Sequence, residues 1–544
     1  MALPAASQTL VSPDYFVETV ASGLTQATNL AFIGPSEMLV NLKASGQVQH
    51  VVNGVVVGTA LDLPVNSASE RGLLGICLDP NFATNGFVYL YYSRSTTSGD
   101  TTTSTQWSDN RVERYVYDNG TLTLDTLVMS VPSDPNQPNG PNHDGGIIMF
   151  GPDGKLYIIT GELNRDRAEQ NNQGQANVSS HVGGIFRLNS DGSIPADNPF
   201  FDNPNADFHK FFAYGIRNSF GMTVDPLTNH IWYTENGPTS YDEVNYVPGP
   251  GLNSGWNEIM GPDDRDPQGV GNLVMFPHAY YHDPEFSWLS TIAVTSILFL
   301  TSDKFGLTER NQCLIGDSNN GNLYLFDVNA NRDGFVLTDT LADKVADNTT
   351  ERNLNRWGQG WGTPTDFDIG PDGYVYVTSL ALGKVLRIRP VQEDVAPTSL
   401  SMVKGSILSG GLGSVLFSDN AWLVTRPGVV FTTQEPPIQV AFESTSPFAS
   451  PTNLKFSIEG HASTNNIAQG VQLFNFDTNQ YETLDTRTAT MTDSTTTVEI
   501  TSNIGRFIGP DNKLRAKMTY RAQGPVFTWP YTSSIDRVWW HEHH

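Results

Sequence analysis

The chain has 544 residues, and 57 aspartates and glutamates against 31 lysines and arginines give it a formal net charge of −26. This length exceeds one ordinary hydrophobic core and predicts two or more domains. The 38% content of apolar residues excludes a mostly disordered chain. The acidic surplus disfavours nucleic acid as a partner, because binding to phosphates needs a basic surface. No apolar run reaches the ~18 residues of a membrane-spanning helix, so we expect no membrane span.

The first segment, residues 1–14, is expected to be an extension ahead of the first domain. It has neither the basic start nor the long apolar stretch of a secretion signal. The acidic composition nevertheless suits a secreted protein. We therefore expect an extracellular or periplasmic protein whose signal is absent from this sequence.

One pattern recurs along residues 15–392: a short apolar stretch, a proline, a polar turn, and then an apolar or aromatic strand. Five copies contain the proline, at Pro35, Pro80, Pro152, Pro226 and Pro371. The last gap is nearly twice the one before it, and a sixth copy without proline fills it at 299–316. Repeated hairpins of this kind cannot bury both faces alone and pack radially. The sequence therefore predicts an all-β protein with a six-bladed β-propeller over residues 15–392.

A change of composition separates the rest of the chain. Residues 393–398 have the composition of a linker. Residues 399–540 are rich in serine and threonine and alternate with period two in places, which favours an accessory β-sandwich. This region has no candidate catalytic cluster, so contact with a cell surface or a glycan is its expected role. The last residues, 541–544, resemble part of an affinity tag.

The first candidate for chemistry is His143, on the glycine-rich loop 140–146. Beside Asn142 and Asp144, an imidazole on such a loop can act as a base on a substrate hydroxyl. A turn histidine that caps its own loop is the alternative.

A guanidinium and a neighbouring amide, Arg217 and Asn218, precede another predicted strand. Facing a pocket, Arg217 would orient a carboxylate, a quinone oxygen or a sugar hydroxyl. The acidic stretch 234–245, which includes Asp242 and Glu243, offers the oxygen ligands that Ca²⁺ requires. Its spacing does not match an EF-hand loop, and an acidic turn without a metal is the alternative.

The order of the motifs from about residue 15 to 392 resembles the glucose/sorbosone dehydrogenase family, the soluble quinoprotein aldose dehydrogenases. The resemblance rests on Arg71-Gly-Leu-Leu-Gly, Asn142-His143-Asp-Gly-Gly, Gly151-Pro-Asp-Gly-Lys-Leu-Tyr, Gly161-Glu162, Gly215-Ile-Arg217-Asn218 and Glu235-Asn-Gly237-Pro238…Asp242-Glu243-Val-Asn245. It implies a six-bladed propeller that holds pyrroloquinoline quinone (PQQ) and Ca²⁺, oxidises a sugar hydroxyl and passes electrons to an external acceptor.

The resemblance also implies roles for individual residues. His143 corresponds to the base that removes the hydroxyl proton, and Glu162 would orient it. Arg217 corresponds to the cation beside the reacting quinone oxygens, and Asn218 to its cofactor-contacting neighbour. The main-chain carbonyls of the two residues before the acidic pair correspond to the ligands of the cofactor's calcium; these are Gly237 and Pro238.

Three positions depart from the family pattern. Asn319 stands near the place of an expected lysine, and Thr363 and Thr365 stand where the family has two arginines. PQQ carries three carboxylates, and leaving them without cations in a partly desolvated pocket costs free energy.

Two other hypotheses keep the propeller without the quinone. In a calcium-dependent hydrolase or lactonase, Ca²⁺ would polarise a carbonyl and His143 would activate water. In a non-catalytic carbohydrate-binding propeller, aromatic side chains such as Trp288 and Trp361 would stack on sugar rings.

Overall fold

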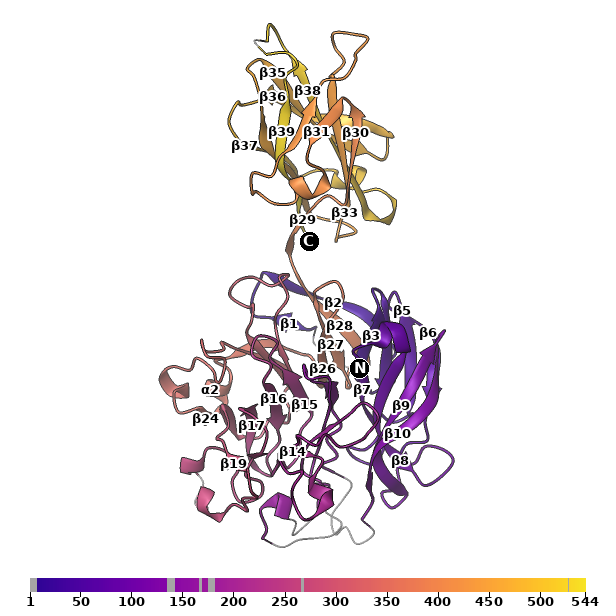
Figure 1. The fold of residues 1–544 in the computed structure, drawn as a ribbon, viewed down its shortest axis with the longest axis vertical. Coiled ribbons are helices and arrows are strands. Elements are labelled where there is room, and N and C mark those ends of the chain that lie inside the picture. Colours follow the sequence, from indigo (N-terminus) through magenta and orange to yellow (C-terminus); the bar gives the residue numbers. More distant parts are fainter. Residues whose placement is uncertain (1–6, 135–141, 166–168, 175–181, 266–268, 527) are drawn as a thin grey trace, which may run out of the picture. The chain divides into compact units, whose positions relative to one another are not determined.

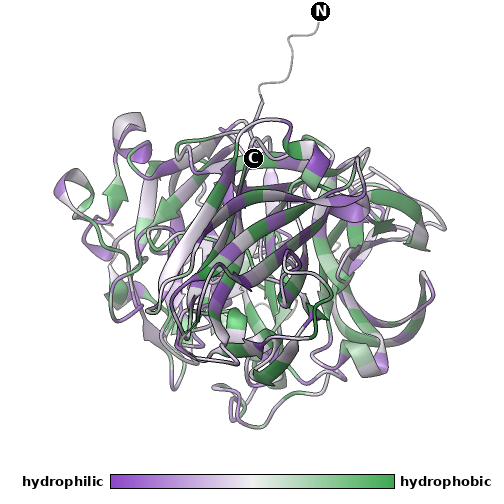
Figure 2. Ribbon diagram, turned by 90° about the horizontal axis from the view of Figure 1, so that it is seen from above, coloured by the Kyte–Doolittle hydropathy of each residue, from purple (hydrophilic) through white to green (hydrophobic). Residues whose placement is uncertain are grey.

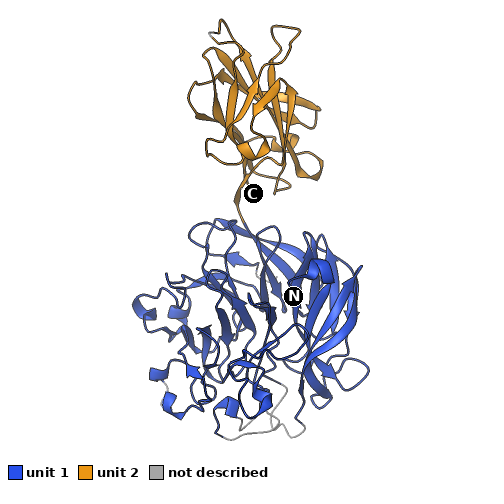
Figure 3. Ribbon diagram, viewed as in Figure 1, with its two compact units in different colours: residues 1–389 blue, residues 390–544 orange. Residues whose placement is uncertain are grey.

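The computed structural model describes residues 7–134, 142–165, 169–174, 182–265, 269–526 and 528–544. The protein is nearly all-β (Figure 1). It divides into two compact units, unit 1 with residues 1–389 and unit 2 with residues 390–544 (Figure 3). The division falls close to the predicted boundary at 392. None of the helices in the described residues is long and apolar enough to cross a membrane.

The described strands of unit 1 form six sheets, and consecutive strands are neighbours in most of each sheet. The first sheet contains β3 (Ala27–Gly34), β4 (Glu37–Leu42), β5 (Gln47–Val52) and β6 (Val55–Asp62). The second contains β7 (Leu73–Leu78), β8 (Phe87–Ser95), β9 (Trp107–Asp118) and β10 (Thr121–Pro132). The third contains β11 (Ile148–Phe150), β12 (Leu156–Thr160), β13 (Gly184–Leu188), β14 (Phe211–Tyr214), β18 (Leu252–Asn253) and β19 (Tyr280–Tyr281).

The other three sheets complete unit 1. The fourth contains β15 (Gly221–Val224), β16 (Ile231–Glu235), β17 (Ser240–Val247), β20 (Phe286–Ser290) and β24 (Val345–Ala346). The fifth contains β21 (Val294–Phe299), β22 (Cys313–Asp317), β23 (Asn322–Phe326), β25 (Arg356–Gln359) and β1 (Thr9–Leu10). The sixth contains β26 (Pro364–Ile369), β27 (Val375–Ser379), β28 (Lys384–Pro390) and β2 (Tyr15–Ser22). Two short helices, α1 (Phe82–Asn85) and α2 (Thr349–Arg352), lie in connections between strands.

The first strands of the six sheets form a closed series of contacts. In order, β3 contacts β7, then β11, β15, β21 and β26 follow, and β26 returns to β3. At the outer edge of the sixth sheet, β2 from the start of the chain pairs with β28 from the end of unit 1, so the two ends of unit 1 meet in one sheet. Each of the six sequence repeats falls on the turn between the first and second strands of one sheet. The segment 1–14, expected to be an extension, contributes β1 to the fifth sheet.

Hydrophobic residues are concentrated in the strands (Figure 2). Neighbouring sheets pack through large side chains; between the fourth and fifth sheets the cluster includes Trp232, Trp288, Tyr324 and Phe326. Trp288 and Trp361 are both buried in the core. They therefore serve packing rather than the stacking on sugar rings that a carbohydrate-binding propeller would need.

Unit 2 contains two sheets in its described residues. One comprises β31 (Ser406–Ser409), β32 (Leu423–Arg426), β39 (Ser533–His543), β34 (Asn453–Ala462) and β37 (Ser494–Ile500), with β29 (Gln392–Val395) paired to β39. The other comprises β30 (Ser399–Lys404), β33 (Ile438–Thr445), β38 (Lys513–Ala522), β35 (Ile467–Asn475) and β36 (Gln480–Thr488). One hydrophobic cluster, which includes Phe442, Phe456, Met518 and Trp540, joins them.

Unit 2 differs from the sequence prediction at both of its ends. The expected linker 393–398 begins inside β29, which pairs with β39. The expected tag-like tail 541–544 lies almost wholly within β39, where Glu542 is buried and accepts a hydrogen bond from the hydroxyl of Ser446. The histidine-rich composition of the tail concealed a strand in which the buried residues Trp540 and Glu542 alternate with the less buried His541 and His543.

The contact between inner strands yields a stability prediction at Gly221. A Cβ at Gly221 would lie less than 3.0 Å from the carbonyl oxygen of Thr295 on β21, whereas one at Gly58 on β6 would meet nothing within 4 Å. We expect Gly221→Ala to lower the free energy of unfolding of unit 1 by about 1–3 kcal/mol, because the strands must separate to accept the methyl group. Thermal unfolding followed by circular dichroism measures the effect, with Gly58→Ala as the control. Equal melting temperatures for the two variants would contradict the prediction.

Candidate active site

The candidate residues gather at one end of the six sheets for a topological reason. In an antiparallel hairpin, the start of the first strand and the end of the second lie at the same edge. His143 precedes β11, Arg217 precedes β15, and Thr363 precedes β26, whereas Glu162 follows β12 and Gly237 follows β16. The innermost hairpins therefore deliver these residues, distant in sequence, to one face of unit 1.

His143 and Glu162 form a hydrogen-bonded pair. The Nδ1 atom of His143 lies against Oε1 of Glu162, and both side chains are largely buried. The residue before Glu162 is Gly161, and no larger residue fits there, because a Cβ would collide with the carbonyl oxygen of His143. A carboxylate facing Nδ1 accepts a hydrogen bond from the proton on that nitrogen, and in this tautomer Nε2 carries no proton and can accept one. The start of the predicted loop, residues 140 and 141, lies outside the described residues.

Arg217 is held beside this pair by main-chain contacts. Its amide donates to Oε1 of Glu235 at 2.6 Å, and its Nη1 donates to the carbonyl oxygen of Asn236 at 2.7 Å. The guanidinium carbon lies 5.2 Å from the ring centre of Trp256. Burial lowers the pKa of Arg217, and the carboxylate of Glu162 opposes that shift. Its Nε is buried and has no hydrogen-bond partner among the described residues.

The three predicted catalytic residues line one cavity. It has a volume of about 260 Å³, and its lining includes His143, Glu162, Arg217, Arg165, Pro238 and Trp256. An imidazole, a guanidinium and an aromatic ring thus face the same space. Such a set can remove a proton from a hydroxyl and stabilise negative charge on a bound partner.

Glu70 connects this cavity to a second one, and sequence reasoning did not select it. Its Oε2 accepts hydrogen bonds from the amide of His143 at 2.6 Å and from Nδ2 of Asn218 at 3.0 Å. Glu70 also lines an adjoining cavity of about 370 Å³ together with Lys43, Thr363 and Thr365. The available signal was its position directly before the Arg71-Gly-Leu-Leu-Gly motif. Trp256, just after β18, was likewise given no role from the sequence.

The predicted cofactor-binding residues are thus distributed over two cavities and the surface. Asn218 faces Glu70, whereas Thr363 and Thr365 belong to the second cavity. Asn319 is exposed and donates its side-chain amide to the carbonyl oxygen of Thr291 at 3.3 Å. It lines neither cavity.

Of the four residues predicted to hold a metal, the two carboxylates already have main-chain or amide donors. Asp242 accepts from the amides of Gly237 at 2.9 Å and of Ile292 and Ala293 at 2.6 Å. Glu243 accepts from the amide of Gly261 and from Nδ2 of Asn245, beside the buried Glu235. Burial raises the pKa values of Asp242 and Glu243. Both carboxylates therefore brace the loop, and neither lines the cavity with His143.

Gly237 and Pro238 lie on the turn that these carboxylates brace. Pro238 reaches the cavity lining. A Cβ at Gly237 would collide with the carbonyl oxygens of Ser240 and Tyr241, so the turn brings main-chain oxygens close together where only glycine fits. Neutral carbonyl oxygens are ligands that Ca²⁺ accepts.

Comparisons with known proteins identify the family of this chain. A sequence model of the family "Glucose / Sorbosone dehydrogenase" matches residues 24–387. The aldose sugar dehydrogenase YliI of Escherichia coli (strain K12) is 29% identical over 386 residues, which span 69% of this chain and 92% of that protein. The quinoprotein glucose dehydrogenase B of Acinetobacter calcoaceticus is 28% identical over 273 residues, 46% of this chain and 54% of that protein.

A solved structure gives the same result. The soluble aldose sugar dehydrogenase from Escherichia coli aligns with a TM-score of 0.51 at 25% identity, over 69% of this chain and 99% of that one. The resemblance inferred from the ordered motifs is thus confirmed, and the relatives are dehydrogenases. The chain is an enzyme that belongs to the glucose/sorbosone dehydrogenase family, the sugar dehydrogenases of the PQQ type.

Proposed function

We propose that this protein oxidises the hydroxyl of an aldose sugar with PQQ and Ca²⁺, with His143 as the base, and passes the electrons to an external acceptor. The observation that carries the proposal is that His143, oriented by Glu162, shares one cavity with Arg217 beside the Gly237–Pro238 turn. The Acinetobacter relative is a quinoprotein glucose dehydrogenase, which supports the choice of cofactor.

The proposal includes the architecture and the location. The closed series of first-strand contacts supports a six-bladed propeller in unit 1, and the two sheets around one core support a β-sandwich in unit 2. We assign unit 2 a docking role toward a cell surface or a glycan, and the protein an extracellular or periplasmic location.

The residues present fit an anionic quinone and its calcium. Arg217 has a buried Nε–H donor that no described residue satisfies, as an anionic partner requires. The buried Oδ1 of Asn218 also has no described partner, and as an acceptor it suits a hydroxyl or N–H group of a bound molecule. Lys43 in the adjoining cavity adds a positive charge that Thr363 and Thr365 do not supply. Arg217, Asn218 and Lys43 would hold the cofactor, and the carbonyl oxygens of Gly237 and Pro238 would hold the ion, with Asp242 as the brace of their turn.

The reaction divides between the chain and the bound groups. When bound, PQQ would supply the hydride acceptor and Ca²⁺ would supply a Lewis acid. The chain's own part is to take the hydroxyl proton at Nε2 of His143. Glu162 keeps the ring in the required tautomer and stabilises the imidazolium that results. Arg217 balances the negative charge that accumulates beside it.

The relatives do not favour the hydrolase or lactonase, or the carbohydrate-binding propeller, because they are named as dehydrogenases. The burial of Trp288 and Trp361 adds to the case against the binding propeller.

The His143–Glu162 pair yields a kinetic prediction. With PQQ, Ca²⁺ and a redox dye, we expect His143→Asn to lower kcat for aldoses by about 10²- to 10⁴-fold, because the base is lost. Glu162→Gln should lower kcat by about 10²-fold or more and alter the pH profile, because the wrong tautomer is favoured. The exposed His278→Asn is the control. Full activity in His143→Asn would refute the base assignment, and absence of PQQ binding at micromolar concentration would refute the cofactor.

Glu70 yields a prediction for a positioning residue. Glu70→Ala removes the acceptor of two hydrogen bonds and leaves the amide of His143 and the side chain of Asn218 unpaired, a cost of about 1–3 kcal/mol. We expect kcat/KM to fall by roughly 10- to 100-fold. Glu70→Gln should recover part of the loss, because an amide oxygen can accept both bonds. Identical kinetics for the Ala and Gln variants would show that these hydrogen bonds do not position the site.

The position of Thr363 in the second cavity yields a prediction of tighter cofactor binding. We expect Thr363→Arg to tighten PQQ binding by roughly tenfold, since a charge-assisted hydrogen bond to a carboxylate is worth about 1.5–3 kcal/mol. Fluorescence titration of the protein with PQQ measures the change. Thr123→Arg, on the exposed face of β10, adds the same charge away from the cavity and should leave the affinity unchanged. An unaltered Kd for PQQ in Thr363→Arg would show that the cofactor does not bind in the second cavity.

A further inference from the structure

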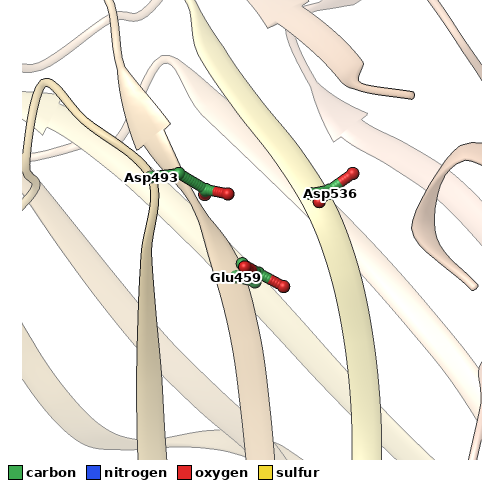
Figure 4. A group of neighbouring side chains, drawn as sticks. All are labelled: Glu459, Asp493 and Asp536. Atoms are coloured by element: carbon green, nitrogen blue, oxygen red, sulfur yellow. The ribbon is translucent and has the colours of Figure 1, made fainter. Parts of the chain in front are cut away.

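Unit 2 contains three neighbouring carboxylates that the proposed dehydrogenase activity does not use. Glu459 lies on β34, Asp536 lies on β39, and Asp493 lies in the turn before β37 (Figure 4). One carboxylate oxygen of each lies within 4.8 Å of those of the other two. Like charges at this separation repel one another, so the arrangement is unfavourable unless something compensates it.

The backbone places the three residues together through a β-bulge. β34 and β39 pair Glu459 with Arg537 and Gly460 with Ile535, so Asp536 is the extra residue between two ladder pairs. A bulge re-aims the side chain of its extra residue. On the other side of β34, Ser494 pairs with Gly460, which brings the preceding Asp493 to the same end of the sheet.

Asp536 has no compensation within the described part of the chain. It is 1% exposed, and neither of its carboxylate oxygens has a hydrogen-bond partner there. Asp242 in unit 1 is equally buried, yet it accepts three amide hydrogens. A buried carboxylate without donors or a counter-ion costs several kcal/mol, and proteins retain such groups when they are paired or bind a metal.

Among the described residues, neither Arg537 nor His461 forms a hydrogen bond with the carboxylate of Asp536. Arg537, the next residue on β39, directs its guanidinium to Asp394, at 3.4 Å. His461 on β34 acts electrostatically on Asp493, but its Nδ1 is also buried without a described partner, and its ring packs edge-on against Trp422. Burial, together with Glu459 and Asp536, raises the pKa of Asp493.

We propose that Glu459, Asp493 and Asp536 bind a calcium ion in unit 2. Three carboxylates can offer up to about six oxygens, and Ca²⁺ takes 6–8 oxygen ligands in flexible geometry. The ion would neutralise the buried Asp536 and join β34, β39 and the turn before β37. This site is separate from the Gly237–Pro238 turn, and its occupancy does not depend on the proposed oxidation.

Hydrogen–deuterium exchange on the full chain tests the proposal, because it locates the effect in the sequence. After chelation, addition of Ca²⁺ to the wild type should slow amide exchange in residues 457–462 and 533–538 by about tenfold or more, since binding stabilises the folded form. Asp536→Asn keeps the size of the side chain and removes its charge, and it should abolish this slowing. Asp477→Asn, in the exposed turn after β35, is the matched control and should behave as the wild type.

The dehydrogenase site provides an internal reference. Any calcium-dependent protection around residues 237–242 should be the same in wild type and Asp536→Asn, so failure of one site is distinguished from failure of the other. Asp493→Asn is a second variant with the same expected loss, should Asp536→Asn fail to fold. The proposal is overturned if Ca²⁺ leaves 457–462 and 533–538 unchanged in the wild type, if the Asp536→Asn protein is still protected there, or if Mg²⁺ protects at concentrations where Ca²⁺ does not.

Discussion

The close approach of the innermost strands is the constraint on which unit 1 depends. At Gly75, the space that a Cβ would need holds the main-chain oxygen of Gly146, just before β11, and at Gly221 it holds that of Thr295 on β21. Only glycine lets adjacent sheets meet in this way. The segments just before the first strands are thereby drawn together, and the site is built from them. A looser series of inner strands would move His143 away from Arg217.

Several carboxylates at the site act mainly by positioning other residues through hydrogen bonds. Glu162 orients the imidazole of His143, Glu70 fixes the amide of His143 and the side chain of Asn218, and Asp242 fixes the Gly237 turn. Each acts on an N–H group, and hydrogen bonds to an ionised acceptor are roughly twice as strong as neutral ones. The acidic surplus of the chain is in this respect structural.

The sequence predicted those features that depend on periodicity and on ordered motifs. The six turn–strand repeats mark the inner hairpins, and the motif order led to His143, Glu162 and Arg217, which share a cavity. Glu70 was missed although it directly precedes the Arg71 motif, and Trp256 was missed as well, because the role of each depends on which distant segment lies beside it. Asp242 and Glu243 were selected as metal ligands because composition shows how many oxygens a loop carries, but not where the oxygens point. The final strand was hidden because His541–His543 resembles a tag, although Trp540 and Glu542 alternate as strand residues do.

The two proposed calcium sites illustrate opposite ways of holding the same ion. In unit 1 the acids near the Gly237 turn are saturated by amide donors, so the oxygens left for a cation are neutral carbonyls. Such a site has little charge of its own, and an anionic cofactor that shares the ion would supply the remainder. In unit 2, Asp536 has no described donors, so its charge is available to the ion itself. Ca²⁺ in unit 1 would therefore depend on the presence of the quinone, whereas Ca²⁺ in unit 2 would depend only on the fold of β34 and β39.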